Sequence, residues 1–239
     1  MKKAAKFLVK IVDHMVNFIA LLLILMVMFL SCYMLWDSNQ VYQAADAKNY
    51  EAYIPTEKHT KSFEELQKIN PDIIGWIRIN ETNVNYPLLQ AEDDDTYMNT
   101  DAEGKYSLSG SIFLHCANKP DFSDFNNMIY GHHMEHGMMF GAIDEYLNED
   151  YFNSHRTGSL VVGKKTYKIR IFAVLECEAT EESIFAPTEN DNTLNYIKQH
   201  ALFLDDTALP KDNEKLLGLS TCKYPDTVDR TLIFGALDG

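Results

Sequence analysis

An uninterrupted apolar run near the N-terminus is the strongest pattern in this chain of 239 residues. It spans residues 18–36 (FIALLLILMVMFLSCYMLW) and contains no charged residue. Because a helix needs about 20 apolar residues to cross the hydrocarbon core of a bilayer, we predict one transmembrane helix here. Residues 1–17 have an excess of lysine, which predicts a cytoplasmic N-terminus and an extracellular remainder. A cleaved signal peptide is the alternative, but its apolar core is usually only about 7–15 residues long, so we favour an uncleaved anchor.

The segment after the anchor is polar at first and then becomes helical. Residues 37–61 are rich in Asn, Gln, Lys, Glu and Ala, which predicts a stalk with some helix. The sequence Ser-Phe-Glu-Glu at 62–65 then matches a capping box, and apolar residues follow at helical spacing. Pro71 ends this helix, because proline disfavours the α conformation in the residue before it. We therefore expect one folded domain over 62–239 that begins with a short helix.

Short apolar runs bounded by turn residues fill most of this domain and predict β-strands. Helical spacing recurs at 139–147 and at 194–201, and the second stretch belongs to an acidic insertion over about 178–214, before the penultimate strand. Many short strands with few helices favour a mainly β fold, either a barrel or a sandwich. The predicted strands lie at 75–80, 84–89, 111–114, 128–130, 159–162, 167–175, 216–221 and 231–237, with a hairpin turn at 163–165.

The overall charge excludes one class of function. The formal net charge is −14, and the charged residues form no concentrated basic face of the kind that holds nucleic acid by its phosphates. A hydrophobic content of 46% fits a folded protein. The basic end, the apolar run and the acidic body together describe a protein divided by a membrane.

The cysteine count favours a functional thiol over a disulfide scaffold. Cys32 lies in the predicted membrane span, which leaves Cys116, Cys177 and Cys222 outside. Because three is odd, at least one of these thiols remains unpaired within the chain. Cys116 and Cys177 are expected to pack in the core, with a disulfide between them as the alternative. A bridge from Cys116 to Cys222 would silence a catalytic Cys222, so we also hypothesise that activity depends on reductant.

Cys222 is the candidate nucleophile because of its position at the end of an apolar strand. The sequence Leu-Gly-Leu-Ser-Thr-Cys would present the thiol at the rim of a barrel, where a substrate can approach. Lys223 and Arg230 are close in sequence and would favour the thiolate. From the local sequence alone, a buried core cysteine is an equally good interpretation.

Two further residues could complete a catalytic group. His132 follows a short strand and Gly131, which we expect to relax the backbone for a turn; its imidazole can exchange a proton at working pH. Arg230 begins the last strand and would return beside Cys222 if the last two strands pair; its planar fork of donors suits an oxyanion. An ordinary loop histidine and a surface arginine are the alternatives.

Taken together, these residues stand in a pattern that resembles the sortase family. The pattern is Y-G-H-x-M, then L-S-T-C about ninety residues later, then an arginine eight positions beyond the cysteine. The L-S-T-C-x-Y form and the helix-bearing insertion resemble class B. The segments Gly-Trp-Ile at 75–77, TNVNYPLLQ at 82–90 and Gly-Ser-Ile-Phe at 110–113 are similar to that class too, so the resemblance spans about 62–237.

The resemblance implies a fold, a reaction and partners. It implies a closed β-barrel of about eight strands, with Cys222, His132 and Arg230 as catalytic residues and with Ser220 and Thr221 on the strand that lines the substrate groove. The implied enzyme is a cysteine transpeptidase that needs no cofactor and no metal. It would cut an Asn-Pro-x-Thr-like sorting signal near the C-terminus of a surface protein or pilin through a thioester. It would then pass the acyl group to a peptidoglycan or pilin amine on the outer face of a Gram-positive-type membrane.

Three other interpretations remain. A cysteine peptidase would use the same residues with water as the acceptor. An L,D-transpeptidase normally carries a Ser-His-Gly segment before its cysteine, and none precedes Cys222. A metal-binding or adhesive surface module would use the neighbouring His132, His133 and His136, although the glycines around them argue against a helix that presents histidines at zinc-binding spacing.

Overall fold

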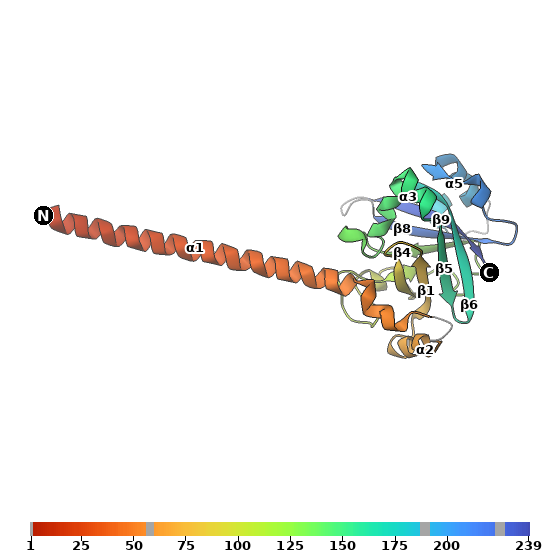
Figure 1. Cartoon of the computed structure of the whole chain (residues 1–239), viewed down its shortest axis with the longest axis horizontal. Coiled ribbons are helices and arrows are strands. Elements are labelled where there is room, and N and C mark those ends of the chain that lie inside the picture. The colour runs from red at the N-terminus through yellow and green to blue at the C-terminus, as the bar shows by residue number, and fades with distance from the viewer. Residues whose placement is uncertain (1, 56–59, 187–191, 223–227) are drawn as a thin grey trace. The chain divides into compact units, whose positions relative to one another are not determined.

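The computed structural model describes residues 2–55, 60–186, 192–222 and 228–239. It divides into two units, Met1–Gln43 and Ala44–Gly239. The first unit consists of most of helix α1 (Lys2–Ala45), which is long and apolar enough to cross a membrane and contains the predicted span (Figure 1). The same length and composition also suit a signal sequence, so the uncleaved anchor and its orientation stay predictions.

A closed β-barrel forms the second unit (Figure 1). The nine-stranded sheet has the order β5-β1-β2-β3-β4-β8-β9-β6-β7, and β6 pairs back with β5, so all strands except β7 belong to a closed ring. Neighbours are antiparallel except for the pairs β2–β3 and β4–β8, which are parallel. The predicted mainly β barrel of about eight strands is confirmed. The strands are β1 (Ile73–Ile79), β2 (Asn85–Leu89), β3 (Ile112–Leu114), β4 (Asn126–Tyr130), β5 (Thr157–Val162), β6 (Lys165–Glu178), β7 (Phe203–Leu204), β8 (Lys215–Cys222) and β9 (Asp229–Asp238).

Strand β9 shows why the last apolar run is nearly continuous and not alternating. Ile233 belongs to the large core inside the barrel, whereas Leu232 and Phe234 belong to a second apolar cluster with residues of the insertion. Successive side chains of a strand point to opposite faces, so a strand covered on both faces needs apolar residues at every position. The insertion therefore packs against the outside of the barrel.

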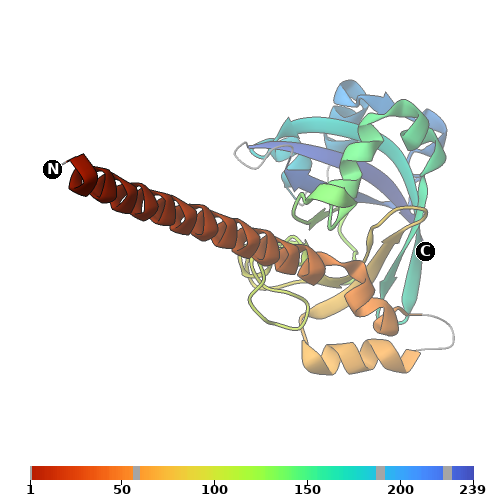
Figure 2. The ribbon, with the colours of Figure 1, turned by 60° about the vertical axis from the view of Figure 1, so that its left-hand side comes forward.

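Two helices of that insertion supply the cover. Helices α4 (Glu182–Phe185) and α5 (Asn192–His200) bury Ile184 and Ile197 in the second cluster, and the 3-10 turn η5 (Asp206–Ala208) follows. The predicted helix in the insertion is thus present. Helix α2 (Thr60–Ile69) lies at the other end of the domain from α5 in both views (Figures 1 and 2) and ends before Pro71, as expected. It begins two residues before the predicted capping box.

The predicted helix at 139–147 has a different form in the structure. It is the 3-10 helix η4 (Gly141–Leu147), and α3 (Glu149–Ser154) follows after Asn148, whose side chain caps it. Gly141 is crowded, because an added Cβ would lie 1.9 Å from the carbonyl oxygen of Met134. The apolar spacing still buries Ile143 and Tyr146, but Leu147 at the end of the predicted face is exposed. Other 3-10 turns are η1 (Ala47–Tyr53), η2 (Thr96–Met98) and η3 (Glu135–Gly137).

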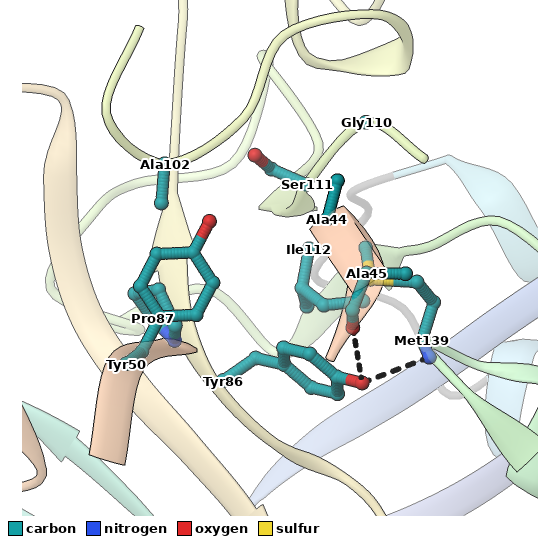
Figure 3. Close-up of a pocket in the computed structure, with 10 residues that line it drawn as sticks. All are labelled: Ala44, Ala45, Tyr50, Tyr86, Pro87, Ala102, Gly110, Ser111, Ile112 and Met139. Atoms are coloured by element: carbon teal, nitrogen blue, oxygen red, sulfur yellow. Dashed lines mark hydrogen bonds between the residues drawn. The ribbon is translucent and has the colours of Figure 1, made fainter. Parts of the chain in front are cut away.

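The compact unit begins inside the predicted stalk (Figure 3). Ala45 and Tyr50 are buried in the barrel core, and the Tyr86 hydroxyl donates to the carbonyl oxygen of Ala45 at 3.1 Å. The same hydroxyl accepts from the N–H of Met139 at 3.0 Å. Burial raises the pKa of Tyr86 to about 12, so the hydroxyl stays a neutral donor. The start of the domain is therefore fixed by both packing and hydrogen bonds.

Candidate active site

The ends of three neighbouring strands bring the predicted catalytic residues to one edge of the barrel. Strands β8 and β9 are antiparallel and place Cys222 directly opposite Arg230, which confirms that the last two strands pair. Strand β4 runs parallel to β8, with Tyr130 opposite Ser220. His132 and Cys222 each lie two residues beyond that pair, so the backbone delivers both to the same edge. The structure describes Cys222 by its backbone only.

Gly131 is needed at this edge for space. Its N–H donates to the carbonyl oxygen of Ser220 at 3.3 Å, which continues the β4–β8 contact. A Cβ on Gly131 would meet Ile112 Cδ1 at 2.4 Å and the Phe140 ring at 2.9 Å. Its φ is outside the left-handed region, so close packing, and not the predicted freedom of the backbone, requires glycine here.

The His132 ring is held by a main-chain carbonyl. Its Nε2 lies 2.6 Å from the carbonyl oxygen of Met98, in η2. A carbonyl oxygen only accepts, so Nε2 is the donor and carries a hydrogen. Nδ1 is then the nitrogen that a neutral imidazole has for accepting a proton. The contact fixes both the orientation and the tautomer of the ring.

Arg230 lies between two cysteines across the sheet. It is half-buried, its Nη1 donates to the carbonyl oxygen of Asp229 at 3.2 Å, and it pairs with Cys177 on β6 as well as with Cys222. Burial, followed by the charge of Glu181, raises the pKa of Cys177 to about 12, although Arg230 acts in the opposite direction. Cys177 is therefore a protonated thiol of low reactivity. It is only partly buried, packed against the second apolar cluster and not inside the core.

Neither cysteine outside the catalytic group forms the disulfide considered from sequence. Cys116 and Cys177 are both free thiols in the structure. The alternative of a Cys116–Cys177 bridge is thus absent. The hypothetical bridge to Cys222 stays a prediction, since that side chain lies outside the described part of the chain.

A cleft of about 360 Å³ opens at the catalytic edge. His132, Arg230, Ser220 and Thr221 all line it, as the resemblance implied for the last two. Ser220 Oγ and Thr221 Oγ1 are buried and have no hydrogen-bond partner within the described residues. Unpaired buried oxygens of this kind cost free energy. The remaining lining residues are Asp94, Asp95, Met98, Phe113, His115, Tyr130, Gly131, Ala179 and Phe185.

Sequence reasoning missed part of this cleft. Met98 contributes a main-chain oxygen, which no side-chain pattern reveals. Neither Asp94 nor His115 was among the candidate site residues identified from the sequence. Only the tertiary pairing of β3, β4 and β8 brings these residues beside His132.

The three clustered histidines do not form the metal site considered as an alternative. His133 Nε2 instead contacts Asp144 Oδ2 at 2.6 Å, and His136 adopts a left-handed φ of 62° in η3. Among the described residues, Asp94, His115 and Cys116 form the group whose ligand atoms are close enough together to hold a metal ion.

Comparisons with known proteins agree with the architecture and the motifs. The Sortase domain family model matches residues 77–238. Sortase B of Listeria monocytogenes is 34% identical over 164 residues, which cover 66% of this chain and 65% of that protein. Sortase B of Staphylococcus aureus is 29% identical over 206 residues, which cover 82% of this chain and 80% of that protein.

A solved structure shows the same likeness in three dimensions. Spy0129, a Streptococcus pyogenes class B sortase involved in pilus biogenesis, is 33% identical and has a TM-score of 0.69, with 77% of this chain and 100% of that chain covered. The matched stretch spans just under two thirds of the Listeria protein's length and all of the streptococcal chain. The barrel, the catalytic edge and these comparisons together show that the chain belongs to the sortase family of cysteine transpeptidases and is a class B sortase.

Proposed function

We propose that this chain is a membrane-anchored transpeptidase that acts through Cys222, His132 and Arg230. The observation that carries the proposal is the pairing of Cys222 with Arg230 at the barrel edge where His132 faces a peptide-sized cleft. The apolar helix α1 supports an anchor with the barrel on the outer side, since the lysines lie before the apolar run.

The first half of the reaction breaks a peptide bond. The Cys222 thiolate attacks the carbonyl carbon of the sorting signal, and the negative charge that develops on its oxygen is stabilised by Arg230. The C–N bond then breaks, and protonated His132 gives a proton to the leaving amine, which would otherwise leave poorly. Because Nε2 donates its hydrogen to the carbonyl oxygen of Met98, this proton comes from Nδ1. A thioester on Cys222 remains.

The second half transfers the acyl group. An incoming amine attacks the thioester carbon, neutral His132 accepts a proton at Nδ1, and the thiolate of Cys222 leaves. No cofactor takes part in these steps. Water in place of the amine would make the enzyme a hydrolase, so exclusion of water from the cleft decides the product.

The substrates are proposed from the family. An Asn-Pro-x-Thr-like sorting signal would lie along Ser220 and Thr221, which line the cleft. The acceptor would be a peptidoglycan amine or a pilin amine. We include the pilin amine because the streptococcal relative is involved in pilus biogenesis.

A ligation assay tests this function. The full chain in detergent is incubated with a quenched Asn-Pro-Gln-Thr-Asn peptide and triglycine, and products are followed by mass spectrometry. Cleavage after threonine with joining to triglycine is expected, and Cys222→Ala should abolish both. Cys177→Ala is the matched control and should keep both. Cleavage without joining, for every amine tried, would favour a cysteine peptidase, and an inert protein whose Cys222 resists alkylation would favour an adhesive module.

A further inference from the structure

Three different metal-ligating side chains meet at the wall of the cleft, outside the proposed catalytic group. Asp94, His115 and Cys116 each offer one ligand atom, and these atoms all lie within 4.8 Å of one another. Asp94 Oδ2 lies 2.6 Å from His115 Nδ1, and Cys116 Sγ lies 3.8 Å from the same nitrogen. All three residues are partly buried. The mechanism proposed above uses none of them.

The arrangement is not that of a second nucleophile. In a catalytic Cys-His-Asp group, the histidine uses one ring nitrogen for the thiol and the other for the carboxylate. Here the thiol and the carboxylate both approach Nδ1, so no proton can pass between them through the ring. Convergence of three donors on one point instead suits a cation.

The spacing fits a tetrahedral ion. With zinc bonds of about 2.0–2.3 Å, tetrahedral ligand atoms lie about 3.3–3.8 Å apart. For one sulfur and one nitrogen ligand the separation is about 3.5 Å, so the 3.8 Å between Sγ and Nδ1 must close by about 0.3 Å. The 2.6 Å between Nδ1 and Oδ2 is a hydrogen bond that must open by about 0.8 Å when two metal bonds replace it. A half-exposed carboxylate on a loop can make that movement.

The main chain holds the three ligands in place. His115 and Cys116 directly follow β3, and the His115 N–H donates to the carbonyl oxygen of Met128 at 2.8 Å. The Cys116 N–H donates to Asp94 Oδ1 at 2.7 Å, which orients the carboxylate so that its other oxygen faces the imidazole. Gln90 Nε2 donates to the carbonyl oxygen of His115 at 3.0 Å. Outer contacts of this kind orient ligands in metal sites.

We propose that Asp94, His115 and Cys116 bind one zinc-type divalent ion. Thiolate, imidazole and carboxylate are the ligand types that zinc takes, and three protein ligands leave a fourth position for water. Asp94 and His115 also line the substrate cleft, so the ion lies in its wall, near Arg230 and His132. The acidic residues beside Asp94 (Glu92, Asp93 and Asp95) raise the local concentration of cations.

Cobalt spectroscopy tests the site without relying on activity. The full chain carrying Cys222→Ala is used in detergent, so that the proposed catalytic thiol cannot bind metal. Added Co²⁺ is expected to bind at one ion per chain and give a thiolate-to-cobalt charge-transfer band in the near ultraviolet, and Zn²⁺ should displace it. Adding Cys116→Ser should remove the band, whereas the matched change Cys177→Ser should keep it.

A second variant guards against misfolding of the first. His115→Gln keeps the thiol, and loss of one ligand is expected to weaken Co²⁺ binding by at least about tenfold. Circular dichroism of each variant checks the barrel. A protein that gives no charge-transfer band, or a band that survives Cys116→Ser, would overturn the metal site and leave Asp94–His115 as an ion pair between two loops.

Discussion

The imidazole Nε2 of His132 lies 2.6 Å from the main-chain oxygen of Met98. Met98 ends η2, 34 residues before His132, yet the two meet because β3 and β4 pair beside that turn. The contact plays the part that a carboxylate plays in many catalytic groups, since it fixes one tautomer of the ring. A main-chain acceptor does so without adding a charge next to the ring.

The tautomer of His132 should be visible directly. We expect ¹⁵N shifts of neutral His132 to report a hydrogen on Nε2 and a bare Nδ1. The neighbouring His133 is expected to show the same tautomer, because its Nε2 donates to the carboxylate of Asp144. His132→Asn should lower kcat by about 10²–10⁴-fold, the usual worth of a general acid and base. A hydrogen found on Nδ1 of the neutral ring would contradict the assignment.

Replacing Arg230 by lysine should separate charge from geometry. Lysine keeps the positive charge but loses the planar fork that faces a developing oxyanion, so kcat should fall by about 10²–10³-fold with little change in stability. Arg78→Lys, at the exposed position of β1, is the matched control and should leave kcat unchanged. Full activity of Arg230→Lys would show that only charge matters at this position.

Gly131→Ala should disturb the barrel edge through crowding. The added methyl would clash with Ile112 Cδ1 and the Phe140 ring, and overpacking of this kind costs about 1–3 kcal/mol of unfolding free energy. Ile112→Val removes the closer of the two atoms and should partly restore the double variant in a urea titration. If the unfolding free energies lost in the two single variants simply add in the double variant, contact with Ile112 is not what makes Gly131→Ala destabilising.

The stability of the domain should depend on acid through Glu214. Burial alone would raise the pKa of Glu214, but hydrogen bonds from Arg170 Nη2 and from the N–H of Lys211 outweigh it and lower the pKa below its ordinary value. A carboxyl group whose pKa is lower in the folded state than in the unfolded state stabilises the fold at pH values above its ordinary pKa. This contribution to the unfolding free energy is lost as the pH falls through the pKa of the folded state. Glu214→Gln should therefore cost about 1–3 kcal/mol near pH 7 and progressively less below about pH 4.

Urea titrations of wild type and variant from pH 7 to pH 3 measure this difference. Glu64→Gln, at an exposed position of α2, is the control and should change little at either pH. A penalty for Glu214→Gln that stays constant over the whole range would mean that the ionised carboxylate is not what stabilises the fold.

Sequence predicted the barrel well because its strands obey local rules. The β5–β6 hairpin turns at Gly163, whose φ of 57° suits glycine, and the Cys222–Arg230 pairing followed from a short loop between two strands. The parallel contact of β4 with β8 could not be found locally, because these strands lie far apart in the chain. Yet that contact is what brings His132 to the edge.

The cleft shows where residue patterns stop being informative. Ser220 and Thr221 were identified through a motif. Met98 instead contributes its main-chain oxygen, and Asp94 reaches the cleft from a loop that is hydrogen-bonded to Cys116, just after β3. Gly131 was expected to supply a turn, but the structure gives it a packing role that depends on Ile112, a residue from another strand. Such roles are set by neighbours that sequence order does not reveal.

The proposed role of Cys222 can be tested through the mass of the acyl intermediate. The full chain in detergent is mixed with the sorting-signal peptide without an acceptor amine, quenched in acid, and measured intact and after digestion. We expect one adduct equal to the acyl fragment that ends in threonine, carried by Cys222 as a thioester and lost on addition of triglycine. Turnover with no adduct, or an adduct on Cys116 or Cys177, would contradict it.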